Sequence, residues 1–173
     1  MQSISQNRWY ALFVNTGQED KVKEKICFKL QDEIRAIVPK RKMRERKGGK
    51  WEDKTRVLFP GYILLNGSIT ITKYNIIRQI PGVIRLLGDS DGPQQIDEQE
   101  IKVIKGLISQ NELIGFSSIY VNNGRIIVSE GPLLGLEGYI KALDKRKGRV
   151  KVMLNLLGET RVVELSVSMV QPV

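Results

Sequence analysis

Histidine is absent from this chain of 173 residues, and Cys27 is its only cysteine. Without histidine, the chain lacks the usual general base near neutral pH and the commonest metal ligand. A single cysteine excludes an internal disulfide and a metal site built from cysteines. The sequence also has no phosphate-binding G-x-x-x-x-G-K-S/T motif and no nucleophile elbow. We therefore expect no enzymatic activity, no metal and no cofactor.

Long apolar runs are missing as well, and so is an apolar signal segment at the N-terminus. These absences predict a soluble, cytoplasmic protein without a membrane partner. Hydrophobic residues make up 41% of the chain, which is enough for a folded core. Acidic residues are few relative to basic ones, 19 against 28, which gives a formal net charge of +9. Such an excess favours a polyanionic partner, nucleic acid first and an anionic membrane second.

A strand and a helix are predicted at the start of the chain. Arg8–Val14 is short, aromatic and β-prone, and it alternates apolar residues onto both faces, so it predicts a central strand. Thr16 and Glu19 fit a capping box, and a helix is expected from about Gln18 to Glu33. Its apolar stripe repeats every fourth residue and comprises Val22, Ile26, Leu30 and Ile34.

The central stretch of the chain is Arg56–Leu65, with the sequence R-V-L-F-P-G-Y-I-L-L. Pro60-Gly61 interrupts an otherwise strand-like run, because proline lacks a ladder donor and glycine marks a bulge. Phe59 and Tyr62 lie on either side of this break. From the residues alone, they are either core aromatics beside a kink in the sheet or rings turned outward to a partner.

A strongly basic segment precedes that stretch. Lys40–Lys50 contains Glu45 as its only acid, and Gly48-Gly49 is typical of a hairpin turn. The charges are consistent with a solvated hairpin or with a phosphate-binding one, and its first residues are candidates for reaching nucleic acid.

Further helices and turns follow the central stretch. Residues 71–80 have helical spacing, Val83–Leu87 predicts a strand, and a second helix is expected from Asp97 to about Gln110. Asp89 and Asp91 resemble a carboxylate pair, but the Gly-Pro that follows them indicates a turn. These elements predict an α+β fold, a sandwich of a mostly antiparallel sheet with helices, over residues 1–110.

The last third of the chain has no helical pattern. Residues 111–120 predict a linker, and residues 121–173 predict a small β-barrel of about five strands. Lys145–Arg149 is expected at a hairpin tip, with Lys141 and Lys151 on the flanking strands. The tip is either an ordinary exposed turn or an RNA-phosphate contact, and the absence of acids from Lys145 to Lys151 favours the second interpretation.

Taken together, three motifs resemble the N-terminal (NGN) domain of the NusG family of transcription elongation factors. They are W-Y-A-L-F-V-x-T-G-x-E (Trp9 to Glu19), L-F-P-G-Y-I-L-L (Leu58 to Leu65) and I-P-G-V-I-R-L-L-G (Ile80 to Gly88). The last third resembles the KOW module, a small SH3-like five-stranded barrel, with Gly131-Pro132 and Gly138 in matching positions. The order and spacing match over nearly the whole chain.

This resemblance implies partners and residues. The first module would bind the clamp of RNA polymerase, a second surface would face the non-template DNA strand, and the KOW module would bind a hairpin of the nascent RNA. We expect a monomer. The implied polymerase-binding residues are Trp9, Phe13, Phe59 and Tyr62. The implied non-template DNA residues are Lys73, Tyr74 and Asn75. The expected RNA-binding residues are Lys141, Lys145, Arg146, Lys147, Arg149 and Lys151.

The KOW module departs from the housekeeping pattern of the family. Leu133 and Leu136 occupy positions where exposed phenylalanines usually contact the ribosome or the termination factor Rho. The loss of aromatic area argues against those partners and resembles a specialised antitermination paralog. Two alternatives stay open: a general elongation factor that couples polymerase to ribosome or Rho, and a structural RNA-binding protein with a KOW module.

Overall fold

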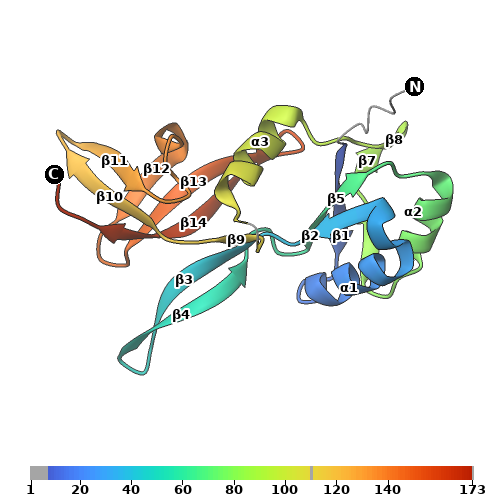
Figure 1. Ribbon diagram of the computed structural model, residues 1–173, viewed down its shortest axis with the longest axis horizontal. Helices are drawn as coiled ribbons and strands as arrows, with labels where there is room; N and C mark the ends of the chain where they lie inside the picture. Colours follow the sequence, from blue (N-terminus) through green and yellow to red (C-terminus); the bar gives the residue numbers. More distant parts are fainter. Residues whose placement is uncertain (1–7, 110, 173) are drawn as a thin grey trace. The chain divides into compact units, whose positions relative to one another are not determined.

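The computed structural model describes residues 8–109 and 111–172. Its internal contacts divide the chain into two units, each built from segments that are distant in the sequence (Figure 1). Within the described residues, the first unit comprises the chain up to Val38 together with Phe59–Ile101. The second unit comprises Pro39–Leu58 together with the chain from Lys102 onward.

The first unit is built on an antiparallel sheet with the strand order β2-β5-β1-β6. The strands are β1 (Trp9–Val14), β2 (Ile34–Ile37), β5 (Tyr62–Gly67) and β6 (Val83–Leu86). Strand β1 has a neighbour on each side, and its Ala11 and Leu12 are fully buried on opposite faces. The prediction of a central strand is therefore confirmed.

Helices follow the predicted apolar periodicity but end earlier than predicted. Helix α1 (Glu19–Leu30) buries Val22, Ile26 and Leu30, and the single 3₁₀ turn η1 (Gln31–Glu33) follows it. Ile34, the predicted fourth member of the stripe, is buried in β2 instead. Helix α2 is Ile71–Arg78, and α3 is Glu98–Leu107. Gln110, the predicted end of α3, lies outside the described residues.

A short hairpin occupies the predicted turn cluster between β6 and α3. It consists of β7 (Gly88–Asp89) and β8 (Gly92–Pro93), and the Asp89 carboxylate accepts a hydrogen bond from the Asp91 backbone N–H at 2.9 Å. Asp89 therefore stabilises the turn, as the Gly-Pro sequence predicted.

The second unit contains a five-stranded sheet with the order β11-β10-β14-β13-β12. These strands are β10 (Ser117–Asn122), β11 (Arg125–Glu130), β12 (Ile140–Asp144), β13 (Arg149–Leu156) and β14 (Glu159–Met169), with the 3₁₀ turn η2 (Glu137–Tyr139) before β12. Along β13, every second residue is buried: Val150, Val152, Leu154 and Leu156. This alternation forms a one-sided core, as expected for a small barrel-like sheet of the KOW type.

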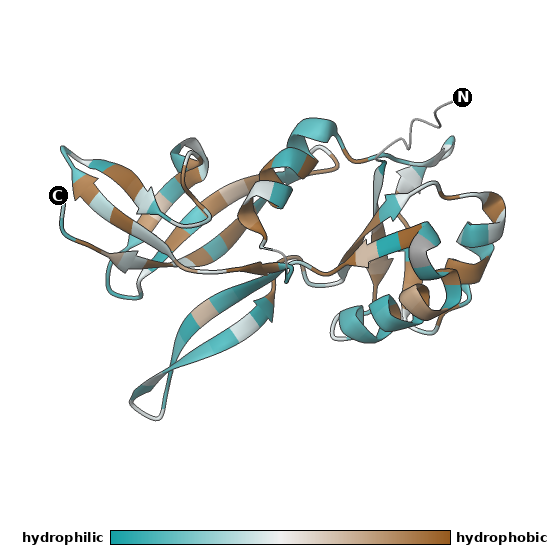
Figure 2. Cartoon of the chain, viewed as in Figure 1, coloured by the Kyte–Doolittle hydropathy of each residue, from teal (hydrophilic) through white to brown (hydrophobic). Residues whose placement is uncertain are grey.

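The basic segment forms a long hairpin that belongs to the second unit. Strands β3 (Lys40–Lys47) and β4 (Lys50–Val57) pair along their full length, and β9 (Leu113–Ile114) pairs with β3. Gly48 and Gly49 both have positive φ, which a two-residue turn of this twist requires, so the predicted turn is confirmed. Figure 2 shows that the hairpin is hydrophilic along most of its length.

Hydrogen bonds attach this hairpin to β14 and β13. The Arg41 guanidinium donates to the Glu164 carbonyl at 2.5 Å, and the Arg44 N–H donates to Ser166 Oγ at 3.2 Å. These contacts group the residues differently from the predicted division into domains 1–110 and 121–173 with a linker at 111–120. That division stays a prediction. Residues 111–120, the predicted linker, contain β9 and the start of β10.

The Glu19 side chain does not form the predicted capping box. The N-cap of α1 is Gln18, without a side-chain cap. The buried Glu19 carboxylate instead accepts hydrogen bonds from the Gly17 N–H at 2.9 Å and from the Gly61 N–H at 2.8 Å. Glu19 thereby fastens the start of α1 to the Pro60-Gly61 break, next to Phe59 and Tyr62.

Replacing Glu19 with alanine is expected to lower the free energy of unfolding by about 2 to 3 kcal/mol, because the buried Gly61 N–H loses a charged acceptor. Chemical denaturation of wild type and variant measures this difference. Glu24→Ala is the matched control, because Glu24 lies exposed on the same helix. An equally small effect of both substitutions would contradict a stabilising role of the Glu19 carboxylate.

Across residues 8–109 and 111–172, none of the helices combines the length and apolar character that crossing a bilayer requires.

Candidate functional site

The four aromatic residues that the sequence assigned to one surface divide into a buried pair and an exposed pair. Trp9 and Phe59 are 5% and 3% exposed, so they belong to the core of the first unit. Phe13 and Tyr62 are partly exposed and lie opposite each other across β1 and β5. Their ring centroids are 5.4 Å apart with an interplanar angle of 42°. The free surface therefore presents Phe13 and Tyr62, and not the full predicted set.

Gly61 explains how the Pro-Gly break presents this pair. Its φ is +85°, and a Cβ at this position would lie 3.3 Å from the Phe13 ring and from the Val14 carbonyl oxygen. Only glycine allows the backbone to pass this close to Phe13 in that conformation. The break thus sends Phe59 into the core and Tyr62 towards Phe13.

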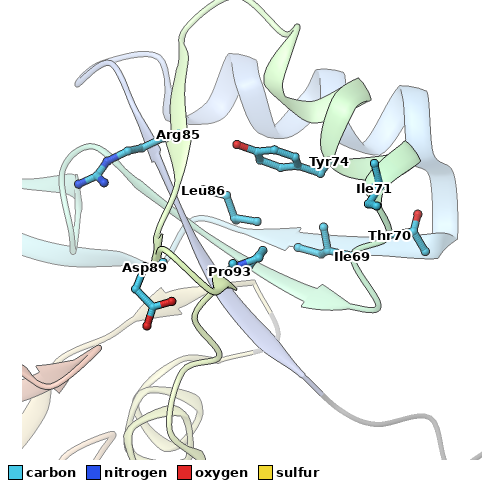
Figure 3. Close-up of a pocket in the computed structure, with 10 residues that line it drawn as sticks. Ile69, Thr70, Ile71, Tyr74, Arg85, Leu86, Asp89 and Pro93 are labelled. Carbon is cyan, nitrogen blue, oxygen red and sulfur yellow. The ribbon is translucent and has the colours of Figure 1, made fainter.

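The predicted DNA-facing residues lie at or near a pocket of about 350 Å³ in the first unit. Figure 3 shows the Tyr74 ring on one side of the pocket, with Leu86 and Ile69 nearby and Arg85 and Asp89 farther round the rim. Asn75 is exposed but does not line the pocket. Arg85 is a pocket residue that the sequence did not single out.

Lys73 is less suited to a phosphate than its sequence position suggested. Its ammonium donates to the Ser68 carbonyl at 3.2 Å and lies 3.4 Å from a Glu33 carboxylate oxygen. A second cation lies near the aromatic ring: the Arg78 guanidinium is 5.9 Å from the centroid of Tyr74. Tyr74 and Arg85 thus line the pocket, with Arg78 beside the ring of Tyr74.

A basic groove of about 430 Å³ lies in the second unit, between the β3–β4 hairpin and the β12–β13 turn. Its lining includes no acidic residue and consists of Arg44, Trp51, Lys145, Arg146, Lys147, Gly148, Val167, Ser168 and Met169. The structure thus brings together three of the predicted RNA-binding residues with two residues of the hairpin. Trp51 was missed, and Arg44 was considered only as part of the basic segment Lys40–Lys50, because the proximity of the hairpin to the turn depends on contacts across more than a hundred residues of sequence.

Local hydrogen bonds shape the β12–β13 turn that carries the three cations. The Lys147 N–H donates to the Asp144 carboxylate at 2.9 Å, and Gly148 adopts a φ of +65°. A Cβ on Gly148 would lie 3.2 Å from the Val167 carbonyl oxygen, so glycine lets the turn pack closely against β14. The turn is fixed while the side chains of Lys145, Arg146 and Lys147 remain exposed.

The other predicted RNA-binding residues lie outside this groove. Arg149 is mostly buried, forms an ion pair with Glu164 at 3.3 Å and donates to the Arg44 carbonyl at 3.1 Å. It therefore attaches the hairpin to the sheet, and its charge is partly neutralised. Lys141 and Lys151 are exposed on β12 and β13 but do not line the groove.

Charges on the opposite face of the hairpin are paired. Arg56 and Glu45 form a bidentate pair with distances of 2.7 and 3.1 Å, and this hydrogen bonding lowers the pKa of Glu45 and raises that of Arg56. Lys54 lies 3.2 Å from Glu52 on the same face. Burial lowers the pKa of Arg41, and the nearby Glu164 carboxylate opposes that shift. Ion pairs thus engage Arg56 and Lys54 on this face, whereas Arg44 and Arg46 lie exposed on the face that carries Trp51.

The lowered pKa of Glu45 predicts an acid-sensitive contribution to stability. Because the folded pKa lies below the unfolded value of about 4.3, the contribution is complete above that pH and is lost as the pH falls through the folded pKa. Glu45→Gln should therefore be less stable than wild type at neutral pH and equally stable in strong acid. Denaturation curves across the acid range measure this, and a stability difference that does not change with pH would contradict it. Because the pair is exposed, we expect the difference to be small.

The turn after β11 corrects one sequence expectation. Leu133, predicted at an exposed position, is buried, and its N–H donates to Ser117 Oγ at 3.0 Å. The exposed apolar residue is Leu134, with 59% of its surface accessible, while Leu136 is partly exposed. Of the two leucines that the sequence pattern singled out, only Leu136 is thus partly exposed, and the exposed leucine of this turn is Leu134.

The fold is shared with a solved structure. The structure of Thermotoga maritima NusG matches with a TM-score of 0.57 at 21% sequence identity, and the match covers 93% of this chain and 94% of that chain. The architecture is thus an α+β unit combined with a five-stranded, KOW-like sheet.

The model of the family described as transcription termination factor NusG matches residues 7–105, more than half of the chain. The chain therefore belongs to the NusG family. The transcription termination/antitermination protein NusG of Rickettsia prowazekii is 27% identical over 171 residues, which is 95% of this chain and 89% of that protein. The protein of the same name from Thermus thermophilus is 28% identical over 177 residues, 94% of this chain and 96% of that protein.

Proposed function

We propose that this chain is a bacterial, cytoplasmic antitermination factor that binds RNA polymerase and nascent RNA and catalyses no reaction. The polymerase clamp would pack on the face formed by Phe13 and Tyr62, because exposed aromatic anchors commonly dominate interface energetics. The transcript would enter the basic groove of the second unit, where Lys145, Arg146 and Lys147 are free to pair with phosphates. Membership of the NusG family supports the polymerase contact.

The basic groove is the observation that carries the antitermination role. The groove places exposed cations from two hairpins around one cavity, and Leu134 is the exposed apolar residue of the turn after β11. The basic tip Lys145–Arg149, with Leu133 and Leu136 at the family's phenylalanine positions, resembles the specialised NusG paralog LoaP. This resemblance implies recognition of an RNA hairpin in a leader transcript. A factor held on polymerase and on that hairpin would suppress pausing and termination downstream.

A general NusG role is the second candidate, and the length of the match favours it. The relatives named above align over nearly their whole length and are called termination/antitermination proteins. Leu134 is then the exposed apolar residue with which the module would contact a ribosomal protein or Rho.

For the non-template DNA strand we propose the pocket around Tyr74, with Asn75 beside it. The tyrosine ring can stack on an unpaired base, and Arg85 and Arg78 can pair with its phosphates. Lys73 would contribute through its ion pair with Glu33, which fixes the start of α2.

In vitro transcription through a terminator separates the two candidates. The antitermination role predicts that the chain raises read-through only when the template encodes its leader hairpin upstream. The general role predicts the same effect on templates with and without the leader, together with binding of the chain to a ribosomal protein or Rho.

A further inference from the structure

Trp51 is an exposed indole on a strongly hydrophilic hairpin. It is 48% exposed, whereas Trp9, the other tryptophan of the chain, is 5% exposed in the core of the first unit. Figure 2 shows hydrophilic residues along most of the hairpin formed by β3 and β4. An aromatic ring left half in solvent among charges contributes little to a core, so its position needs another explanation.

The strand register places Trp51 among cations. Trp51 is directly opposite Arg46, and Arg44 is opposite Asp53 one pleat further along. In an antiparallel hairpin, two residues that face each other across the strands lie on the same face, and so does every second residue along each strand. Arg44, Arg46 and Trp51 therefore point to the same side of the hairpin. Asp53, the acid on that side, is engaged by Lys42 at 3.6 Å.

The same face closes one side of the basic groove. Arg44 and Trp51 line it from the hairpin, and Lys145, Arg146 and Lys147 line it from the β12–β13 turn. Its volume of about 430 Å³ lies within the range of roughly 300–1,000 Å³ that small-ligand sites occupy. Hydrogen bonds from Arg44 to Ser166 and from Arg149 to Arg44 fix the hairpin against the sheet, so both walls belong to the second unit.

An aromatic ring flanked by free cations is the arrangement with which proteins bind unpaired nucleotides. The ring stacks on a base of any sequence, and the cations pair with the phosphates on either side. We infer that Trp51 is a stacking platform for an unpaired nucleotide of RNA, with Arg44 and the three cations of the β12–β13 turn on its phosphates. This inference rests on the proposed RNA-binding function and adds a base contact that phosphate-binding cations cannot provide.

Tryptophan fluorescence tests this inference directly, because Trp51 is the exposed one of two tryptophans. The wild-type chain and the variants Trp51→Ala and Trp51→Phe are each titrated with a single-stranded RNA of twelve nucleotides at several salt concentrations. We expect RNA to quench the emission of the wild type and to leave that of Trp51→Phe unchanged. Binding followed by fluorescence anisotropy of labelled RNA should weaken roughly 5- to 150-fold in Trp51→Ala, as removal of one stacked base predicts.

The salt dependence separates stacking from charge pairing. Trp51→Ala should keep the wild-type salt slope because it retains every cation that pairs with a phosphate, and Trp51→Phe should recover part of the affinity. Two results would overturn the stacking role: RNA binding by the wild type without quenching of its emission, or an unchanged affinity of Trp51→Ala for RNA. Either result would leave the proposed RNA-binding function standing. Absence of RNA binding by the wild type would overturn both. Tighter binding of a DNA of the same sequence would overturn RNA as the occupant.

Discussion

Replacing Phe13 and Tyr62 together with alanine is expected to weaken binding of the chain to RNA polymerase by about 30-fold or more, the loss typical of aromatic anchors. The two rings are the partly exposed members of the predicted aromatic set and contact each other across β1 and β5. Because Phe13 and Tyr62 are not among the buried core residues, whereas Trp9 and Phe59 are, the double variant should remain folded. Pull-down of purified polymerase by the tagged chain measures the loss, and terminator read-through should fall with it.

Phe28→Ala is the control for this variant. Phe28 lies on α1 and is the most exposed of the large hydrophobic side chains in the described part of the chain, so its replacement removes an exposed aromatic ring without touching the Phe13–Tyr62 pair. We expect Phe28→Ala to bind polymerase as the wild type does. If the double variant retained its affinity and its read-through, the polymerase contact would have to lie elsewhere.

Replacing Lys145, Arg146 and Lys147 with alanine is expected to weaken RNA binding about tenfold or more at low salt. The salt slope should decrease by about one unit for each phosphate that the variant no longer binds, because each bound phosphate releases counterions from the RNA. The three side chains are exposed around one groove, and the turn that positions them is fixed by Asp144 and Gly148, which the variant retains. Titrations of labelled leader RNA at increasing salt measure both quantities.

A variant of α1 controls for the loss of net charge. Lys21, Lys25 and Lys29 are exposed in the first unit, and their replacement by alanine removes the same three charges. This control should keep the wild-type salt slope, because those residues are not at the groove. Equal effects of the two triple variants would mean that only the overall charge of the chain attracts RNA.

Local sequence patterns predicted most elements of the fold. The apolar repeat of α1, the double-sided burial of β1 and the Gly48-Gly49 turn all depend on neighbours within a few residues, where propensity and packing agree. The end of α1 was predicted too late because Ile34 also fits the helical stripe, and only the sheet shows that it belongs to β2. Short apolar segments at element ends have this ambiguity in general.

The candidate sites could be predicted only in part, because they depend on contacts that are distant in sequence. The spacing of residues in the sequence cannot show that Pro60-Gly61 turns Phe59 into the core and Tyr62 towards Phe13. That outcome depends on the close packing of the Gly61 backbone against the Phe13 ring. Nor can the spacing show that the hairpin with Arg44 and Trp51 packs against β14. The predicted cluster of charges at the tip was therefore incomplete, with Arg149 engaged in an ion pair and the aromatic member of the groove missing.

The proposed mechanism requires both surfaces on one chain, because antitermination depends on a physical link between polymerase and the leader RNA. Terminator read-through with an equimolar mixture of the Phe13/Tyr62 variant and the Lys145/Arg146/Lys147 variant tests this most directly. Each chain in the mixture retains one surface, so the account predicts read-through at the level without factor. Recovery of wild-type read-through by the mixture would contradict it.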